Sequence, residues 1–190
     1  MTTKMTPTTR SMDQAYGGRS LHAMDLRRRP GDKTRVNHAV RDLELPEAVF
    51  KTSPWQPRSL VAEGLRQWLR CAGAALRDDQ VIGMPSHAVD EAWHGFILCT
   101  ARYGRFCDAA YGRFLHHHPE GGTPTDLAQS MGDARTQLGR TVVAWSMVAM
   151  PGESCVLWDL DERVGVEHPW GIRPPPRLGT ICSDRRRRQR

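Results

Sequence analysis

"MPSHAVDEAWHGFILCTARYGRFCDAAYGRFLHHHP" runs from Met84 to Pro119 and decides how the rest of the chain is interpreted. Aromatic and apolar residues, with one threonine, recur along it every three or four positions, which places their side chains on one face of an α-helix. They are Val89, Trp93, Phe96, Thr100, Tyr103, Cys107, Tyr111 and Phe114. Ser86 precedes this period and belongs to the residue types that cap helix N-termini. The stretch predicts helix from residue 86 to about residue 115.

The same stretch carries four candidate metal ligands, His94, Cys107, His116 and His117. Imidazole and thiolate ligands suit zinc or iron. Asp90 lies four residues before His94 and offers acidic support. No HExxH signature accompanies these residues, so the pattern by itself does not specify a known class of metal site.

Helix geometry places a strict condition on such a site. In one straight helix, His94 and Cys107 would lie about 20 Å apart, and His94 and His117 about 35 Å apart, at a rise of ~1.5 Å per residue. A shared site therefore requires a break that folds the two halves into a hairpin. Thr100, which can cap a second helix, and Gly104 are the candidate positions for that break.

A longer pattern of residues resembles the central motif of a known family. It comprises Met84, Pro85, Ser86, Val89, Asp90, Trp93, His94, Phe96, Ile97, Leu98, Tyr103, Phe106, Cys107, Gly112, Arg113, Phe114, Leu115, His116, His117 and Pro119. The pattern is similar to that of bacterial proteins described as glycine-rich domain-containing protein-like. With "LRQWLR" upstream and "LWDLDERVGV" downstream, the resemblance extends over about residues 43–172.

The resemblance implies a helix break but no biochemical activity. A more distant version, in plant glycine-rich domain proteins, has a proline where Thr100 stands, which supports a break near residues 99–101. Two positions depart from the family pattern: Tyr111 replaces a phenylalanine, and His118 stands where members often have threonine. The resemblance therefore gives the triple histidine no shared role.

With a break near Thr100, helices over about 86–98 and 101–115 form a hairpin whose core we expect to contain Trp93, Phe96, Tyr103 and Phe114. Three other assignments stay open at this point. His94 is either a ligand or a ring that hydrogen-bonds Asp90 or a main-chain carbonyl at the break. Arg113 is either a surface charge or a partner of Asp90 or Glu91. His116 and His117 are either ligands or histidines favoured by the negative end of the helix dipole.

Three further helices are expected outside the hairpin. "RSLVAEGLRQWLRCAGAALRDD" carries an apolar stripe from Val61 to Leu76, residues 125–150 carry another, and "CVLWDLDERVG" is a short helix with Ser154 as a possible cap. No strand pattern persists. The fold class expected is all-α, with residues 43–172 forming a single irregular bundle of four to five helices.

The positive charge is concentrated at the two ends of the chain. The net charge of the protein is +6, yet residues 41–183 carry 14 basic and 17 acidic residues. Residues 1–42 are predicted to be a disordered basic tail, and residues 173–190 a tail rich in proline and arginine. Such tails can contact phosphate or nucleic acid weakly, without reading a sequence.

Composition argues against several other functions. The mean hydropathy is −0.55 and no apolar run reaches the ~18–20 residues of a membrane span, so no membrane partner is expected. Because the N-terminus lacks the apolar core of a secretory signal, a cytoplasmic location is expected. The five cysteines form no CxxC pair and are expected to be buried thiols. A Cys107–His94 nucleophile is disfavoured because burial raises a thiol pKa.

The sequence leaves three hypotheses about function. The first is a binding or adaptor module built on the hairpin, with an unknown protein partner. The second is a metal-binding protein or metal-dependent enzyme that uses His94, Cys107 and His116 or His117 to hold zinc or iron. The third is a nucleic-acid-associated protein that binds phosphate through its tails.

Overall fold

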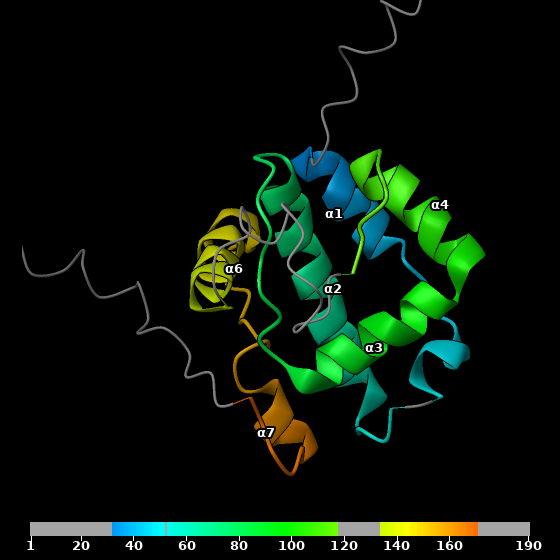
Figure 1. Cartoon of the computed structure of the whole chain (residues 1–190), viewed down its shortest axis with the longest axis vertical. Helices are drawn as coiled ribbons and strands as arrows, with labels where there is room; N and C mark the ends of the chain where they lie inside the picture. Colours follow the sequence, from blue (N-terminus) through cyan, green and yellow to red (C-terminus); the bar gives the residue numbers. More distant parts are fainter. Residues whose placement is uncertain (1–31, 52, 118–133, 171–190) are drawn as a thin grey trace, which may run out of the picture.

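The structure is a computed structural model that describes residues 32–51, 53–117 and 134–170. Its helices are α1 (Lys33–Arg41), the 3-10 helix η2 (Glu47–Phe50), α2 (Arg58–Leu76), α3 (His87–Leu98), α4 (Thr100–Tyr111), α6 (Ala134–Val148) and α7 (Leu160–Val164). These residues contain no strand, so the predicted all-α class is confirmed. The described part of residues 43–172 contains five α-helices, as expected, and α1 lies before that range (Figure 1).

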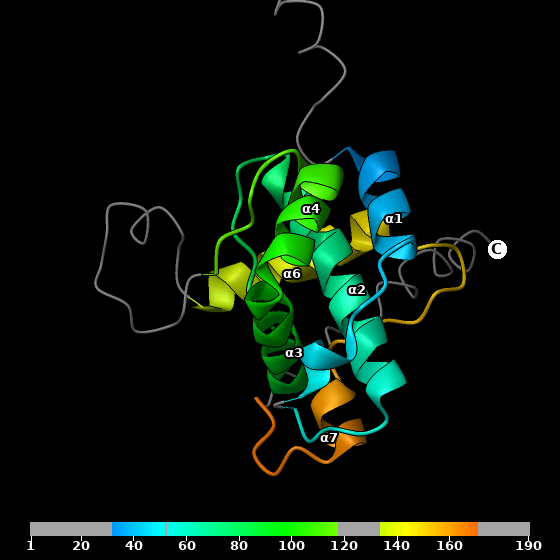
Figure 2. The same ribbon diagram turned by 90° about the vertical axis from the view of Figure 1, so that its right-hand side faces the viewer.

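Helix α2 lies at the centre and contacts α1, α3, α4, α6 and α7 (Figures 1 and 2). The predicted apolar stripe explains its position, because Val61, Leu65 and Leu69 are all fully buried. Each of these side chains stabilises the fold by about 1.5–3 kcal/mol relative to an exposed one. The other α-helices therefore pack around a helix that the sequence pattern identifies.

The boundary predicted for the N-terminal tail is wrong for residues 32–42. They form α1 and its flanks, with Val36 and Val40 buried on one face. The Asp32 carboxylate caps this helix by accepting a hydrogen bond from the Arg35 N–H at 3.0 Å. Two valines one turn apart and a capping aspartate were too short a pattern to detect beside the preceding arginine-rich run. The predictions for residues 1–31 and 171–190 lie outside the described residues.

Helix α6 buries its predicted face only in part. The stripe predicted for it includes Leu138, Val142, Trp145 and Val148, of which Val148 is buried and the other three are half-buried. Thr141 and Ala144 are buried beside Val148. The Thr141 hydroxyl donates to the Gly83 carbonyl at 2.8 Å, which draws the small-residue face towards the core. The predicted start, at residues 125–133, lies outside the described residues.

The last helix starts later than expected, so Ser154 is not its cap. Residues 154–156 are held instead by the buried Gln67 side chain of α2. Its amide nitrogen donates to the Ser154 carbonyl at 3.0 Å, and its amide oxygen accepts from the Val156 N–H at 2.9 Å. The glutamine satisfies main-chain groups that a helix would have paired internally, so α7 begins only at Leu160.

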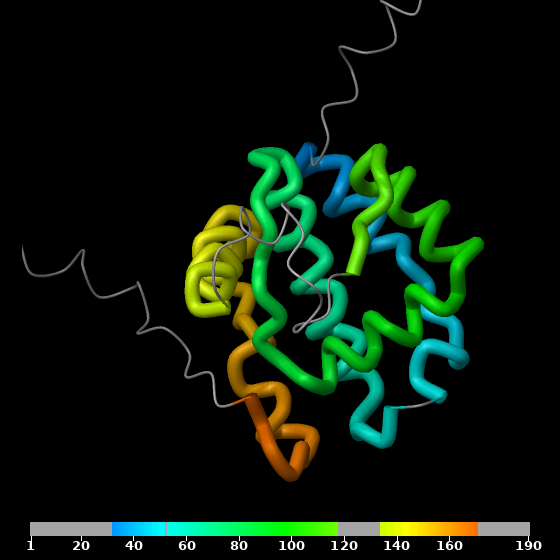
Figure 3. Tube along the Cα trace, viewed as in Figure 1, coloured from blue at the N-terminus to red at the C-terminus, as the bar shows by residue number. Residues whose placement is uncertain are grey.

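The predicted break in the Met84–Pro119 stretch is confirmed. Helix α3 ends at Leu98, Cys99 has φ −79° and ψ 51°, and α4 starts at Thr100. The α4 arm ends early, because Gly112 adopts a left-handed conformation (φ 72°) that glycine enters without steric cost. The chain then turns back towards α3, as the trace in Figure 3 shows.

Candidate metal centre

Helix α3 presents two of the candidate ligands on one face. Asp90 and His94 are four residues apart, which places their side chains one above the other. The His94 Nδ1 atom lies 2.9 Å from the Asp90 main-chain oxygen and 3.3 Å from its carboxylate Oδ2. The predicted hydrogen bond between His94 and Asp90 is therefore present.

The start of α3 is fixed by contacts from two parts of the chain. Ser86 is the predicted cap, and its hydroxyl oxygen accepts from the Val89 N–H at 3.2 Å. Asp161 of α7 adds a buried carboxylate, which accepts from the Ser86 hydroxyl at 2.6 Å and from the main-chain N–H groups of His87 and Ala88 at 2.9 and 3.1 Å. The sequence analysis missed Asp161, whose signal was only an acidic residue in the "LWDLDERVGV" motif.

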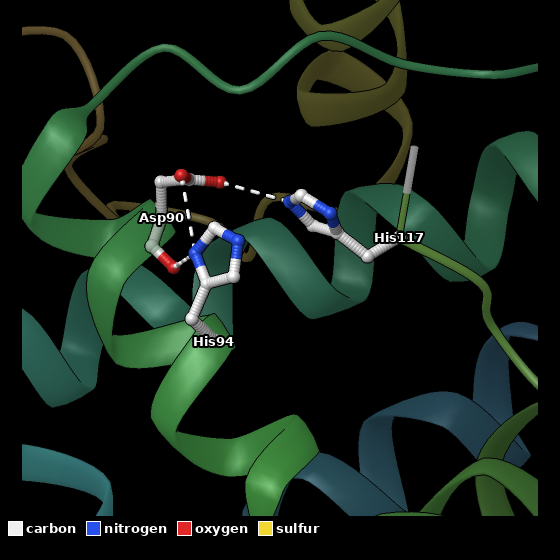
Figure 4. A group of neighbouring side chains, drawn as sticks. All are labelled: Asp90, His94 and His117. Carbon is white, nitrogen blue, oxygen red and sulfur yellow. Dashed lines mark hydrogen bonds and ion pairs between the residues drawn. The ribbon is translucent and has the colours of Figure 1, made fainter. Parts of the chain in front are cut away.

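The turn at Gly112 brings His117 over this face of α3. The His117 Nε2 atom lies 3.5 Å from the Asp90 carboxylate Oδ1, and the His94 and His117 ring centroids are 4.2 Å apart. Figure 4 shows the two imidazoles approaching the same carboxylate, one from α3 and one from the stretch after α4. Two segments separated by a whole helix thus meet at one carboxylate.

One ligand atom from each of Asp90, His94 and His117 lies within 4.8 Å of the other two. Two ligands bound tetrahedrally to zinc at about 2.0–2.1 Å are about 3.4 Å apart, close to the observed separation of His117 and Asp90. The side chains of Asp90 and His117 are 20% and 19% exposed, and that of His94 is 48% exposed. The group is therefore partly enclosed and reachable from solvent on the His94 side.

The other two predicted ligands are not part of this group. Cys107 is buried in α4, and burial raises the pKa of its thiol, although contacts with the Leu115 main chain and the Tyr103 side chain oppose the shift. His116 is exposed, with its ring centroid 4.9 Å from that of Phe114. His118 lies outside the described residues. The raised thiol pKa agrees with the expectation that Cys107 is a poor nucleophile.

Arg113 fits the surface-charge alternative, and Phe114 differs from its predicted role in the core. The Arg113 guanidinium donates to the Asp79 carboxylate and to the Leu76 carbonyl, each at 2.9 Å, and not to Asp90 or Glu91. The early end of α4 carries both residues away from the hairpin core, which leaves Phe114 47% exposed. Trp93, Phe96 and Tyr103 are buried as predicted.

A second surface feature lies between α2 and α6. It is a groove of about 300 Å³ lined mainly by apolar side chains, among them Ala74 and Ala75 of α2 and Val143 and Met147 of α6. Val143 is 60% exposed and Met147 is 41% exposed. None of these residues belongs to the Asp90, His94 and His117 group.

The fold and this group define a class: a helical protein with two histidines and one carboxylate gathered at a hairpin. The family model described as UCP032817-like, an uncharacterised family, matches residues 45–138 of the chain. The matched range includes all three residues of the group and excludes α1 and α7. No curated protein and no solved structure matches the chain. The resemblance to glycine-rich domain-containing proteins stays a prediction.

Among the described residues, no helix combines the length and the apolar character that crossing a bilayer requires. The cytoplasmic location remains a prediction.

Proposed function

We propose that this protein binds a divalent transition-metal ion through Asp90, His94 and His117. The observation that carries the proposal is the convergence of one carboxylate and two imidazoles, from two separate segments, within 4.8 Å. Two histidines with one carboxylate form the ligand set of open zinc sites and of non-haem iron sites. The proposal keeps His94 and His117 from the sequence analysis and replaces Cys107 and His116 with Asp90.

The hydrogen bonding of His94 supports this role. A carbonyl oxygen only accepts, so the bond of 2.9 Å requires that the His94 Nδ1 atom carry the proton. The Nε2 atom then keeps its lone pair for an ion. Metal-binding histidines usually donate their other ring N–H to a carbonyl or carboxylate, which fixes the tautomer and the orientation of the ring.

The wall behind the group is aromatic. The Trp93 ring lies 4.8 Å from the His117 ring and 4.3 Å from the Trp68 ring. Such a surface limits water on one side of the group, whereas the His94 side remains accessible. Three protein ligands leave positions for water or a small ligand, and a bound zinc or iron ion would supply Lewis-acid chemistry there.

Metal analysis of the purified full-length chain tests the proposal, together with zinc and anaerobic iron(II) titrations. We expect one bound ion per chain. His94→Ala and His117→Ala should each weaken binding by more than about 100-fold, because even the outer-shell partners of metal ligands contribute 10–100-fold.

His116→Ala is the matched control, because it removes an exposed imidazole next to His117 and should leave the affinity unchanged. Comparable metal content in the wild type, His94→Ala and His117→Ala proteins, with only stability reduced, would sink the proposal. An equal loss in His116→Ala and His117→Ala would also count against it.

The other two hypotheses from the sequence stay predictions. The binding or adaptor module was predicted on the hairpin, and the groove between α2 and α6 is a separate apolar surface whose lining includes no residue of the ligand group. Phosphate or nucleic-acid contact would use the tails, which lie outside the described residues.

A further inference from the structure

We infer that the hydroxyl group of Tyr103 is the positioning group of this centre, because it holds the stretch that carries His117 over Asp90. The inference rests on the proposed metal-binding function and specifies how the third ligand is held. It assigns Tyr103 no contact with the ion itself.

The two ligands on α3 and the third ligand are held in different ways. Asp90 and His94 are fixed relative to each other by the helix. His117 follows five residues that have no regular secondary structure, after α4 has ended at Tyr111. Its position over α3 therefore depends on tertiary contacts of that stretch.

Two side chains of α4 meet that stretch at Leu115. The Tyr103 hydroxyl donates to the Leu115 carbonyl at 2.6 Å, and the Cys107 thiol interacts with the Leu115 main chain. Leu115 is two residues before His117, so this short bond acts close to the ligand. A hydroxyl–carbonyl distance of 2.6 Å is at the short end of the range for O–H···O bonds.

Tyr103 is itself fixed from α3. Its side chain is fully buried, and its hydroxyl oxygen accepts from the Trp93 indole N–H at 3.2 Å. The Phe96 and Phe114 rings meet the Tyr103 ring edge-on, with centroids 5.2 and 5.1 Å away. The hydroxyl thus both donates and accepts, and it links α3 to the main chain just before His117.

Trp93 contacts both Tyr103 and His117. Its indole N–H contacts Tyr103, its ring faces His117, and it lies on α3 between Asp90 and His94. Burial raises the pKa of Tyr103, so its hydroxyl keeps the proton that the Leu115 carbonyl needs. The arrangement joins the third ligand to the helix that carries the first two.

The chain provides a matched control at Tyr111. This side chain is also fully buried on α4, and its hydroxyl also donates to a main-chain carbonyl, that of Leu69, at 2.9 Å. That carbonyl belongs to α2 and is not among the contacts that link Tyr103, Trp93 and Leu115 to His117. Tyr103→Phe and Tyr111→Phe each remove one buried hydroxyl. Tyr103→Phe leaves two partners unpaired and Tyr111→Phe leaves one, so both should lower stability, Tyr103→Phe by more.

The test compares the zinc dissociation constant of the full-length protein with that of each variant. We expect Tyr103→Phe to weaken zinc binding by about 10–100-fold, the effect typical of a residue that orients a metal ligand without touching the ion, and Tyr111→Phe to change it by less than about twofold. A second measurement uses the metal-free protein. The NOE between the Trp93 and His117 rings should be lost in Tyr103→Phe and kept in Tyr111→Phe.

Two results would overturn the inference. One is a Tyr103→Phe protein that keeps both the wild-type zinc affinity and the NOE; the other is an equal loss of affinity in both tyrosine variants. Either would leave the Asp90, His94 and His117 proposal intact. Failure of the proposed function is seen separately, as wild-type protein that binds no ion, and the NOE then decides whether Tyr103 positions His117.

Discussion

The two arms of the hairpin, α3 and α4, have the same length but are held in opposite ways. Helix α3 is clamped at its start by Ser86 and Asp161, and Gly95 near its end lies against the Val49 main chain. Helix α4 starts at a bend with no side-chain cap, and the space beside Gly104 is open. These contacts hold α3 tightly near both ends, whereas α4 has room for a side chain at Gly104.

The difference explains how the candidate site is divided. The clamped arm carries Asp90 and His94, whose relative geometry the helix alone provides. The freer arm contributes no ligand of its own, but it delivers His117 through the turn that follows it. A site of this kind gains its third ligand only when the whole hairpin is folded.

The largest expected effect is on the clamped arm, at Gly95. A Cβ atom there would overlap the Val49 carbonyl oxygen and lie within 3.0 Å of the Val49 Cα, and main-chain atoms cannot rotate away. We expect Gly95→Ala to destabilise the protein by about 3 kcal/mol. Urea unfolding measures this as a lower midpoint at an unchanged slope; a wild-type midpoint would show that α3 and η2 can separate freely.

The next effect tests the clamp at the start of α3. Asp161→Ala leaves the Ser86 hydroxyl and two main-chain N–H groups without their acceptor, so we expect a loss of about 2–3 kcal/mol. Thermal and urea unfolding give the value. Asp159→Ala is the control, because its carboxylate is half-exposed and lies 3.6 Å from Arg163, and such pairs contribute less than about 1 kcal/mol. Equal losses would contradict the clamp.

A smaller effect distinguishes the bend from the arm that follows it. Cys99 at the bend is half-buried, whereas Cys107 is buried and burial raises the pKa of its thiol. Because the thiolate is the reactive form, we expect iodoacetamide at pH 8 to modify Cys107 at least about tenfold more slowly than Cys99. Peptide mass spectrometry over time measures both rates. Equal rates would mean that α4 opens readily.

The smallest effect has the opposite sign and belongs to the freer arm. A Cβ atom at Gly104 meets nothing within 4 Å, so alanine adds helix propensity without a clash. We expect Gly104→Ala to stabilise the protein by about 0.5–1 kcal/mol, seen as a higher urea midpoint. Destabilisation there would remove the contrast with Gly95.

The sequence predicted the features of the fold that depend on residues close together in the chain. The three-and-four spacing predicted helix over both α3 and α4. The break between them was predicted as the condition for a shared site and from the family resemblance, and it falls at Cys99. The same reasoning identified Ser86 as a cap, and it placed Asp90 within reach of His94 because both lie on one helix face. These features depend on residues within one or two turns of each other.

The features that were missed depend on distant parts of the chain. Cys107 was favoured as a ligand because a hairpin brings the two arms together, but it faces the core. His117 reaches Asp90 because Gly112 ends α4 early and Tyr103 holds Leu115. Of these, only Gly112 had a local signal, since glycine is the usual residue just beyond a helix C-terminus. The contacts of Tyr103 with Trp93 and Leu115 depend on the tertiary fold and have no signal in the local sequence.

The position of the Asp161 carboxylate determines how far the protein can be truncated. A fragment limited to residues 45–138, the range of the family match, would lack this acceptor and would also lack Val36 and Val40 of α1. Its α3 would begin with exposed donors, and its central helix would lose the cover of α1, α7 and most of α6. We therefore expect an independently folding piece of this protein to extend from α1 to α7.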